Sequence, residues 1–346
     1  MLNPALHEAQ QLLRERLARL LTGASQDLAP DVTQALHSRG KLLSDQSLDG
    51  SGVHSVLPAG VWPLLTFLIA QQISPDINLL VATNVAVATE CYICALDLFD
   101  DVEDGDVTPT IQALGVTRTL PVATTLLSLA NQALLDTAAH LEGAGTLRLL
   151  AALNDTSLTA MCGQHRDLLT EQQAVASLSP QDCLEILTAK SGALMRLACL
   201  LGALAAGAPE EICNKVAELG ELLGIAHQLD NDAHDLYDLL QDNASSPIPT
   251  GEVKSDLARG KKTLPIVLAA DIYGASFQGE TLPVEQEKGE YLRSLHEGIA
   301  VTTGLCLLYR ECFRERLQEF EALTRPLGPA LAYLFAQACA GELDGE

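Results

Sequence analysis

The sequence reads DLFDDVEDGD at residues 97–106, where this acidic stretch ends a long and otherwise apolar helical pattern. Its aspartates recur every three or four residues, which places their carboxylates on one face of a helix. Like charges at that spacing repel by about 0.2–0.5 kcal/mol per pair, and the dipole at a helix C-terminus also disfavours negative charge. A bound Mg²⁺ would offset this repulsion, because Mg²⁺ takes hard oxygen ligands and shares its coordination with substrate phosphates. The alternative for this cluster alone is a solvated acidic helix end.

A second acidic cluster reads QLDNDAHDLYD at residues 228–238 and interrupts another apolar helix pattern. Gln228, Asp232 and Asp235 share one face of this helix, because they are three or four residues apart. Two acidic faces on two long helices predict a cavity with metal sites on opposing walls. Such a cavity suits the clamping of a diphosphate between metal ions.

The densest cationic run follows at residues 256–265, which read DLARGKKTLP. Its two adjacent lysines, Lys261 and Lys262, stand in a chain with 21 Lys and Arg residues against 45 Asp and Glu residues. Cations placed beside carboxylates indicate a polyanionic ligand, with each lysine acting as a point charge on phosphate oxygens. The alternative for the two lysines is a basic helix start.

Composition and charge limit the class of protein. A net charge of −24 makes a poor surface for nucleic acid or for an anionic membrane. Apolar residues make up 48% of the chain and charged residues 19%, which is enough hydrophobic material for a sizeable core. Aromatic residues are only 4%, while Ala and Leu dominate, and this composition favours helices over strands. We therefore expect an all-α fold that forms one domain over residues 1–346.

Helix starts are well marked in the sequence. Residues 179–182 (SPQD) supply an N-cap, a proline at the first helical position and an acid at the third. Residues 208–211 (APEE) supply a second proline-led, acidic first turn. Because apolar residues recur with the period of a helix along almost the whole chain, we expect about ten to thirteen helices in a bundle.

No stretch of 18 or more residues is free of both charge and proline, so we expect no membrane span. Residues 1–21 form an amphipathic helical pattern of mixed charge, which is not typical of a cleavable leader. These observations predict a cytoplasmic protein.

Five motifs, in this order along the chain, resemble those of the trans-isoprenyl diphosphate synthase (polyprenyl synthetase) family of the class I isoprenoid synthase fold. Residues 100–104 (DDVED) look like its first aspartate-rich motif, and residues 163–168 (GQHRDL) resemble its G-Q-x-x-D-L. Residues 190–194 (KSGAL) resemble the Lys-Thr-Gly element that contacts diphosphate. Residues 224–235 (GIAHQLDNDAHD) look like the G-x-x-x-Q…D-D-x-x-D second motif, and residues 256–265 resemble the D-x-x-x-G-K-K-T-L-P segment after it.

The resemblance runs over most of the chain and implies a bundle of antiparallel helices around a deep apolar cavity, with homodimers typical of the family. It implies Mg²⁺-dependent ionisation of an allylic prenyl diphosphate, with two Mg²⁺ ions on the first motif and a third on the second. The implied metal ligands are Asp100, Asp101, Asp104, Asn231, Asp232 and Asp235. Lys190 and Lys262 would hold the diphosphate and stabilise it electrostatically as it leaves.

The same resemblance implies further substrate-binding residues. They are Gln164, Gln228, Lys261, Ala95, Leu96 and Phe99, besides Lys190 and Lys262. Ala95 and Leu96 would line the cavity floor, where a bulky aromatic residue stops chain growth in relatives. Neither is aromatic, so we expect farnesyl or geranylgeranyl diphosphate over the shorter geranyl diphosphate. Phe99 adjoins the metal cluster and is a candidate to face a carbocation.

Two arginines near the C-terminus, Arg310 and Arg314, are one helical turn apart. They are candidates to close over a diphosphate, but surface salt bridges are the default expectation for such residues, and we expect them here.

The sequence departs from the family pattern in three places, of which the first two affect the acceptor and the third affects the second metal motif. Family elongases bind the second, homoallylic diphosphate with a Gly-Lys-Arg-x-Arg-Pro motif, whereas residues 58–62 (PAGVW) carry no cation ahead of Pro63. Elongases also carry an Arg-Arg pair shortly after the first motif, whereas residues 105–110 (GDVTPT) carry none, and Asn231 stands where the second motif begins with Asp. Each charge-assisted hydrogen bond that a diphosphate loses costs about 1.5–3 kcal/mol. We therefore expect elongation with isopentenyl diphosphate to be weak or absent.

The sequence retains the residues that would ionise the allylic diphosphate but lacks those that would bind the acceptor's diphosphate. Three functional hypotheses are consistent with this pattern. The preferred one is a terpene-synthase-like lyase, in which the cation is trapped within the same substrate by cyclisation or quenching. The second is a prenyltransferase, whose acceptor is isopentenyl diphosphate bound in another way or a non-diphosphate acceptor such as a peptide. The third is an inactive regulatory subunit of a prenyl diphosphate synthase, against which the intact aspartates and lysines argue.

Overall fold

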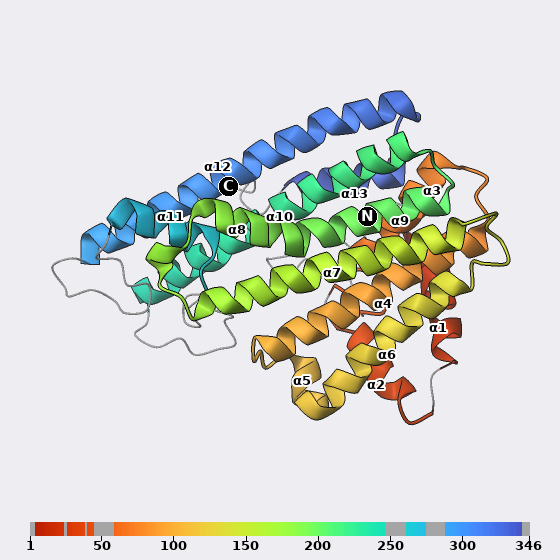
Figure 1. Ribbon diagram of the computed structural model, residues 1–346, viewed down its shortest axis with the longest axis horizontal. Coiled ribbons are helices and arrows are strands. Elements are labelled where there is room, and N and C mark those ends of the chain that lie inside the picture. The colour runs from red at the N-terminus through yellow and green to blue at the C-terminus, as the bar shows by residue number, and fades with distance from the viewer. Residues whose placement is uncertain are drawn as a thin grey trace. The chain divides into compact units, whose positions relative to one another are not determined.

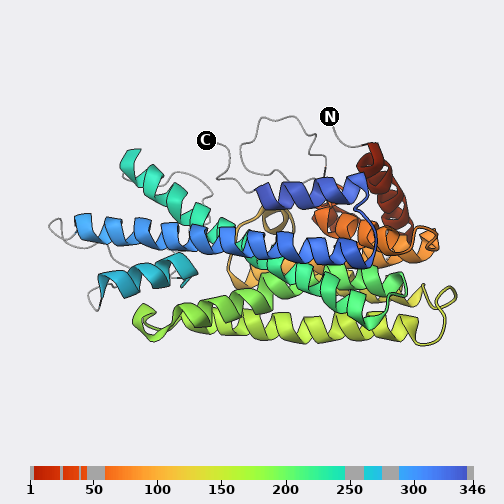
Figure 2. The ribbon, with the colours of Figure 1, turned by 90° about the horizontal axis from the view of Figure 1, so that it is seen from above.

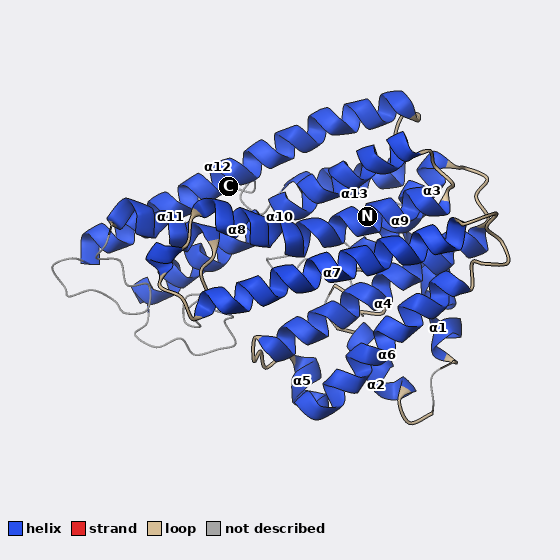
Figure 3. Ribbon diagram, in the orientation of Figure 1, coloured by secondary structure: helices blue, strands red, loops and turns tan. Residues whose placement is uncertain are grey.

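The computed structural model describes residues 4–23, 26–38, 40–44, 59–245, 261–274 and 288–340. Every regular element in these residues is a helix (Figures 1 and 3), which confirms the all-α fold class. The thirteen α-helices of the described residues agree with the expected number. They are α1 (Pro4–Leu21), α2 (Ala29–Leu36), α3 (Val61–Ile73), α4 (Leu79–Glu103), α5 (Pro109–Leu114), α6 (Val116–Leu135), α7 (Gly145–Glu171), α8 (Pro180–Leu187), α9 (Ala193–Ala205), α10 (Glu210–Ser245), α11 (Leu264–Tyr273), α12 (Lys288–Leu323) and α13 (Pro329–Ala340), with a 3₁₀ turn η1 (Val175–Ser177) and a π-helix η2 (Thr188–Gly192).

The chain divides into two compact units. Unit 1 consists of Met1–Thr156, Leu194–Gly220 and Arg316–Glu346, and unit 2 consists of Ser157–Ala193 and Glu221–Glu315. The boundaries fall inside α7, α10 and α12 and directly after Ala193, the first residue of α9, so these four helices contribute residues to both units. The first acidic motif belongs to unit 1, whereas the second motif and the predicted lysines belong to unit 2.

Unit 1 is built around α4, which packs against α6, α3 and α1 (Figure 1). Helix α13 packs against α3 and α1 (Figure 2). Every residue from 81 to 96 is buried, as expected of a helix that is apolar nearly all round. The helix begins after Asn78, whose side chain accepts a hydrogen bond from the Leu80 amide at 2.9 Å. On α9, a Cβ at Gly202 would lie 2.5 Å from the carbonyl oxygen of Thr66 on α3, so the close packing of these two helices requires glycine.

Two segments, Leu79–Glu103 and Pro180–Ala205, are long and apolar enough to cross a membrane by length and composition. The apolar window of the first is 89% buried inside the fold and that of the second 61%. The sequence did not predict a membrane span at α4, because the criterion was a stretch without charge and Glu90 interrupts that helix. Core helices pass the same test of length and composition, so their burial accounts for the apolar pattern.

Unit 2 has its own apolar core, to which α8, α10, α11 and α12 contribute. Leu229 of α10, Ile266 of α11 and Leu295 of α12 belong to this cluster. Gly298 allows α12 to approach α11, because a Cβ there would lie 2.2 Å from the carbonyl oxygen of Pro265. The second acidic motif thus stands on a helix that is packed into a core.

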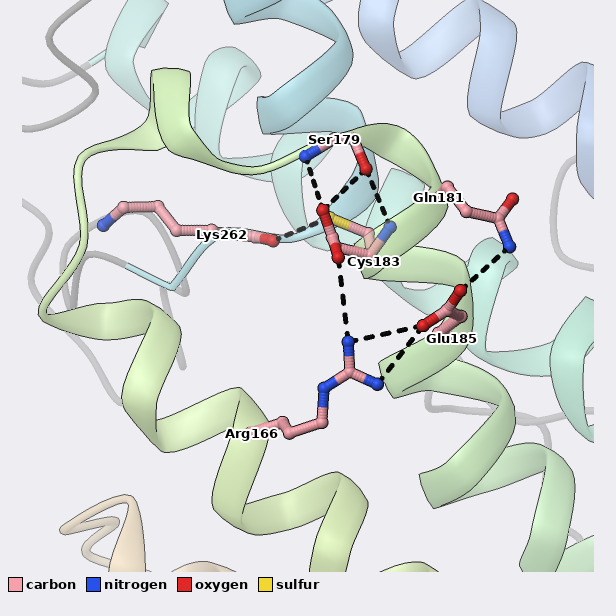
Figure 4. Close-up of polar contacts among 7 residues, drawn as sticks. Arg166, Ser179, Gln181, Cys183, Glu185 and Lys262 are labelled. Carbon is pink, nitrogen blue, oxygen red and sulfur yellow. Dashed lines mark hydrogen bonds and ion pairs between the residues drawn. The ribbon is translucent and has the colours of Figure 1, made fainter.

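The start of α8 confirms the predicted N-cap at Ser179 and the proline-led first turn, and Asp182 completes a capping box (Figure 4). The Ser179 hydroxyl accepts a hydrogen bond from the Asp182 amide at 3.2 Å, and the Asp182 carboxylate accepts one from the Ser179 amide at 3.0 Å. Arg166 reaches from α7 to form ion pairs with Asp182 at 3.7 Å and Glu185 at 3.3 Å. Because α8 runs directly into η2, these contacts also fix the turn that carries Lys190.

Ser179→Ala should lower the free energy of unfolding by about 1 kcal/mol, because the Asp182 amide loses its capping oxygen. Hydrogen bonds from Ser179 hold the pKa of Asp182 below its ordinary value. A lowered carboxyl pKa stabilises the fold above the ordinary pKa, and this stabilisation is lost as the pH falls through the folded-state pKa. Urea denaturation should therefore show a weaker acid-induced loss of stability in the variant. Ser177→Ala is the control, since its hydroxyl donates to the Ala174 carbonyl before α8 begins. An equal effect in both variants would contradict the capping role.

Candidate functional site

The first acidic motif forms the last turn of α4 and the residue that follows it, in unit 1. Asp100 and Asp101 lie in the helix, which ends at Glu103, and Asp104 is the C-cap. The Asp104 amide donates to the Asp100 carbonyl at 2.8 Å. All three aspartates are half-buried. The structure therefore brings the three predicted ligands of this motif together at a helix end, as their spacing predicts.

The segment after α4 folds back onto Asp101. Gly105 turns the chain with a φ of 69°, and the Asp106 amide then donates to the Asp101 carbonyl at 2.8 Å. The Thr108 hydroxyl donates to the Asp101 carboxylate at 3.1 Å, and its oxygen accepts from the Ile111 amide at 3.4 Å as the N-cap of α5. Thr108 thus orients a predicted metal ligand. Thr108 is not among the residues predicted from the sequence, although a threonine followed by proline is a typical helix start.

Thr108→Val should weaken Mg²⁺ binding, because Asp101 loses the hydroxyl that orients its carboxylate. Loss of such a partner typically lowers metal affinity about 10–100-fold. We expect the lower end, because the hydrogen bond from the Asp106 amide still holds the backbone carbonyl of Asp101. Thr108→Ser keeps the hydroxyl and should bind as the wild type does. Isothermal titration of Mg²⁺ in the presence of inorganic pyrophosphate measures the difference, and equal affinities for all three proteins would remove Thr108 from the site.

Lys41 lies beside α4 at the level of Asp97, which is about one helical turn before Asp100. Its ammonium forms an ion pair with Asp97 and is also attracted to Glu90, which is fully buried. The amide of Leu42 donates to the Glu90 carboxylate. Burial by itself lowers the pKa of Lys41, but the negative charge of Asp97 and its neighbours outweighs burial and holds the pKa above its ordinary value. Lys41 is therefore a permanent cation that α4 itself neutralises in part.

The start of α3 carries no basic side chain at residues 59–62, and Pro58 lies outside the described residues. The Gly60 amide donates to the Gly40 carbonyl at 2.8 Å, so the segment with Lys41 lies next to this helix start. The sequence did not predict a cation beside the start of α3, because Lys41 is distant from it along the chain.

Lys190 lies in η2, the π-helix between α8 and α9. π-helical turns frequently occur at functional sites. The Lys190 ammonium pairs with Asp167 of α7 at 2.6 Å, and both side chains are partly exposed. Helix α7 approaches this turn at Gly163, where a Cβ would lie 2.9 Å from the Ala189 Cβ. The structure thus brings together the G-Q-x-x-D-L and Lys-Ser-Gly elements.

A chain of hydrogen bonds joins η2 to the second acidic motif on α10. Ser191 donates to Gln228 Oε1 at 2.8 Å, and Gln228 Nε2 donates to Asp232 Oδ1 at 2.8 Å. Asp232 is buried, whereas Asn231 and Asp235 are exposed. Asp232 is therefore oriented by η2 through Gln228, and the other two predicted ligands of this motif are open to solvent.

Three further predicted substrate-binding residues also lie in unit 2. Gln164 of α7 is 6% exposed, and neither end of its amide has a partner among the described residues. Just before α11, Lys261 is half-buried and Lys262 is buried. The Lys262 carbonyl accepts from Cys183 Sγ at 3.4 Å, while its side chain extends away from Cys183 (Figure 4). Residues 256–260 of the same cationic run lie outside the described residues.

The predicted cavity-floor residues lie on α4 in unit 1. Ala95 and Leu96 are buried, and Phe99, next to Asp100, is half-buried. Burial agrees with a place in the interior, and their effect on chain length stays a prediction.

The donor set of both motifs fits Mg²⁺. Every predicted ligand supplies a carboxylate or amide oxygen, which suits a hard cation, whereas Zn²⁺ is typically bound by His and Cys. No three His, Cys, Asp or Glu side chains in the described part of the chain form a ready-made metal site. Mg²⁺ commonly binds through one or two carboxylates and completes its coordination with water and substrate phosphates. We therefore expect metal binding to depend on a diphosphate.

The prediction of a surface salt bridge is wrong for Arg310 and confirmed for Arg314. Arg310 on α12 is 3% exposed and pairs with Asp230 at 3.0 Å. Arg314 is exposed and pairs with Glu311 at 2.9 Å. The sequence held a signal for this difference, because the apolar residues Cys306 and Phe313, both buried, lie four residues before and three residues after Arg310 on one face of α12. Arg314 lies beside that face and is exposed.

Comparison with known proteins gives matches over most of the chain. The sequence matches the family model described as Polyprenyl synthetase at residues 60–282. The (2E,6E)-farnesyl diphosphate synthase of Mycobacterium tuberculosis (strain ATCC 25618 / H37Rv) is 28% identical over 267 residues, which cover 76% of this chain and 69% of that protein. Tryptophan prenyltransferase ComQ of Bacillus spizizenii is 28% identical over 182 residues, which cover 52% of this chain and 56% of that protein. The crystal structure of heptaprenyl diphosphate synthase from Staphylococcus aureus shares the fold, with a TM-score of 0.73 at 18% identity over 99% of this chain and 98% of that one.

Proposed function

The chain belongs to the polyprenyl synthetase family, and from this we propose that it is a Mg²⁺-dependent prenyltransferase that acts on an allylic prenyl diphosphate. In the proposed reaction the bond between the allylic carbon and the diphosphate oxygen breaks, and its electron pair leaves with the diphosphate. A nucleophilic electron pair of the acceptor then attacks the allylic cation, a new bond forms, and the acceptor loses a proton. Relatives named as a farnesyl diphosphate synthase and as a tryptophan prenyltransferase support transfer.

The observation that carries this proposal is the polar cluster around η2. Lys190 presents a fixed positive charge for the departing diphosphate, and Asp167 holds that ammonium at 2.6 Å. Ser191 orients Asp232 through Gln228. When bound, Mg²⁺ would supply further positive charge to the leaving group. In this proposal, the groups that ionise the diphosphate are oriented before the substrate binds.

The other roles follow the family motifs. We assign metal binding to Asp100, Asp101, Asp104, Asn231, Asp232 and Asp235. Lys261, Lys262 and the buried amide of Gln164 would contact the substrate, while Ala95, Leu96 and Phe99 would face its prenyl chain. We propose farnesyl or geranylgeranyl diphosphate as the allylic substrate and a homodimer as the assembly.

The relatives do not support the intramolecular cyclisation that was the first expectation from the sequence. Their names describe prenyl diphosphate synthases and a prenyltransferase. The preference for cyclisation depended on missing acceptor cations, and an acceptor without a diphosphate would not need those cations.

One structural observation favours such a non-diphosphate acceptor, for example a peptide, as the second candidate beside isopentenyl diphosphate. Neither residues 59–62 nor residues 105–110 carry a basic side chain. Lys41, which lies next to the start of α3, already pairs with Asp97. A second diphosphate would therefore meet little positive charge at these places.

The test incubates the full chain with Mg²⁺ and geranyl, farnesyl or geranylgeranyl diphosphate. Each is supplied alone, with isopentenyl diphosphate, or with a tryptophan-containing peptide. Pyrophosphate release and mass spectrometry of the products distinguish the outcomes. Longer diphosphates that form only with isopentenyl diphosphate would establish elongation, and a prenylated peptide would establish the second candidate. Hydrocarbon or alcohol formed from the allylic substrate alone, with no transfer to either acceptor, would overturn the proposal.

A further inference from the structure

We propose that Arg310 is a positioning residue for the second acidic motif. Its buried ion pair with Asp230 sets the rotation of α10 and so the direction in which the motif presents its oxygen ligands. This inference rests on the metal-binding role that the proposed function gives to the motif. Neither residue belongs to the predicted ligand set, so the pair acts through its neighbours.

The pair lies in the interior of unit 2. Arg310 is 3% exposed and Asp230 is 6% exposed, and Arg310 Nη2 lies 3.0 Å from Asp230 Oδ2. One turn before Arg310, the Cys306 thiol donates to the Ala226 carbonyl at 3.2 Å and lies 4.0 Å from Asp230 Oδ1. The Nε of Arg310 has no partner in the described residues. Helix α12 therefore contacts α10 at this level through polar groups as well as through apolar packing.

Helix α10 is held from two opposite sides. Successive residues of an α-helix are turned by about 100°, so Gln228 and Asp232, two residues before and after Asp230, each lie roughly 160° away from it. Asp230 pairs with α12 through Arg310, whereas Gln228 and Asp232 belong to the hydrogen-bonded chain that begins at Ser191 of η2. A rotation of α10 that separates Asp230 from Arg310 would therefore also turn Asp232 away from its place.

Stability alone is a poor reason for such a pair. Removing two charges from water is costly, and apolar residues of similar volume often replace a buried ion pair with no loss of stability. Apolar packing, however, is non-directional, whereas an ion pair with hydrogen bonds requires one orientation of its partners. What the pair adds is the orientation of α10.

The test compares the wild type with Arg310→Lys, Arg310→Met and the double variant Asp230→Leu/Arg310→Met. Arg314→Met is the matched control, one turn further along α12 and exposed. Arg310→Met alone leaves the Asp230 charge buried and is expected to unfold easily, whereas the double variant removes both charges. Circular dichroism and thermal unfolding establish which variants fold. Isothermal titration of Mg²⁺ in the presence of inorganic pyrophosphate then measures metal affinity without any acceptor or turnover.

We expect the double variant to melt near the wild type but to bind Mg²⁺ about 10–100-fold more weakly, the usual effect of losing a partner that orients a ligand. Arg310→Lys should recover part of the affinity, and Arg314→Met should bind as the wild type does. A double variant that melts and binds like the wild type would overturn the proposal, because the pair would then serve packing alone.

Two further measurements separate this inference from the proposed function. Asp232→Ala tests the metal site by the same titration, and unchanged Mg²⁺ affinity there would overturn the inference, because the motif would bind no metal. Product formation with the two acceptors is assayed separately. A protein that binds Mg²⁺ and pyrophosphate but transfers no prenyl group would contradict the proposed function. The Mg²⁺ affinities of the Arg310 variants would still decide whether Arg310 orients the second acidic motif.

Discussion

Replacing Asp100 and Asp101 together by asparagine should reduce kcat/KM for the allylic diphosphate by about 10²–10³-fold or more, the loss typical of removing groups that stabilise developing charge. The substitution keeps an oxygen on each side chain and nearly the same volume, so it removes little besides the two negative charges that would hold the metal. Stability should not fall. Both residues lie in the last turn of α4, where like charges repel and the helix dipole disfavours them. The variant should therefore unfold at the same temperature as the wild type or slightly above it.

A fall in activity without a fall in stability is the result that distinguishes a functional acidic cluster from a solvated helix end. Pyrophosphate release at varied Mg²⁺ concentration measures the first quantity, and thermal unfolding without ligand measures the second. Glu103→Gln is the matched control, because Glu103 is exposed on the same turn and belongs to no predicted site. Activity retained in the aspartate variant would exclude the first motif from the metal site, and a marked loss of thermal stability would show that the charges serve the fold.

The sequence predicted the helices and caps that are determined by residues close to one another along the chain. The apolar pattern before residue 97 predicted α4, and the spacing of the aspartates placed Asp100, Asp101 and Asp104 at its end. The capping box at Ser179 was also predictable, because its donor and acceptor are three residues apart. In both cases the groups that decide the structure lie close together along the chain.

Contacts between distant parts of the chain were not predictable in the same way. Lys41 meets Asp97 across 56 residues, and Arg310 meets Asp230 from another helix. Residues 105–110 visibly lack the arginines of the family pattern, but nothing in the sequence indicates that Thr108 bonds to Asp101 instead. A single sequence records which side chains are present but not which distant helix faces them. The sequence therefore named the residues inside the motifs, whose roles stay predictions, but not the residues that contact them from distant parts of the chain.

Lys41→Met should lower the free energy of unfolding by about 3 kcal/mol, at the low end of the range for breaking a buried ion pair. The low end applies because Asp97 is about half exposed, with 52% of its side chain accessible, and water can solvate it when Lys41 is lost. Glu90 has no such access, since it is fully buried on α4. Without Lys41, its charge would depend on the hydrogen bond from the Leu42 amide.

The loss should depend on pH in a defined direction. Burial raises the pKa of Glu90, while the attraction of Lys41 and the Leu42 amide oppose that rise. Removing Lys41 should therefore raise the pKa of Glu90 further. A carboxyl group with a raised folded-state pKa contributes stability below its ordinary pKa of about 4.3 and loses that contribution as the pH rises through the folded-state value. The deficit of the variant should be largest at neutral pH and should shrink on acidification.

Urea denaturation at several pH values measures this deficit, and a second substitution identifies its cause. Glu90→Gln in the Lys41→Met background keeps an oxygen for the Leu42 amide but removes the buried charge, so it should recover most of the stability lost at neutral pH. Lys215→Met is the control, because the ion pair of Lys215 with Glu319 is partly exposed and such pairs contribute only about 0–1 kcal/mol. A deficit that is independent of pH, or that Glu90→Gln fails to reduce, would mean that Lys41 stabilises the fold by packing its aliphatic stem against α4. If the predicted pattern is found, the charge of Lys41 is committed to α4, and an acceptor at the start of α3 must be recognised by other groups.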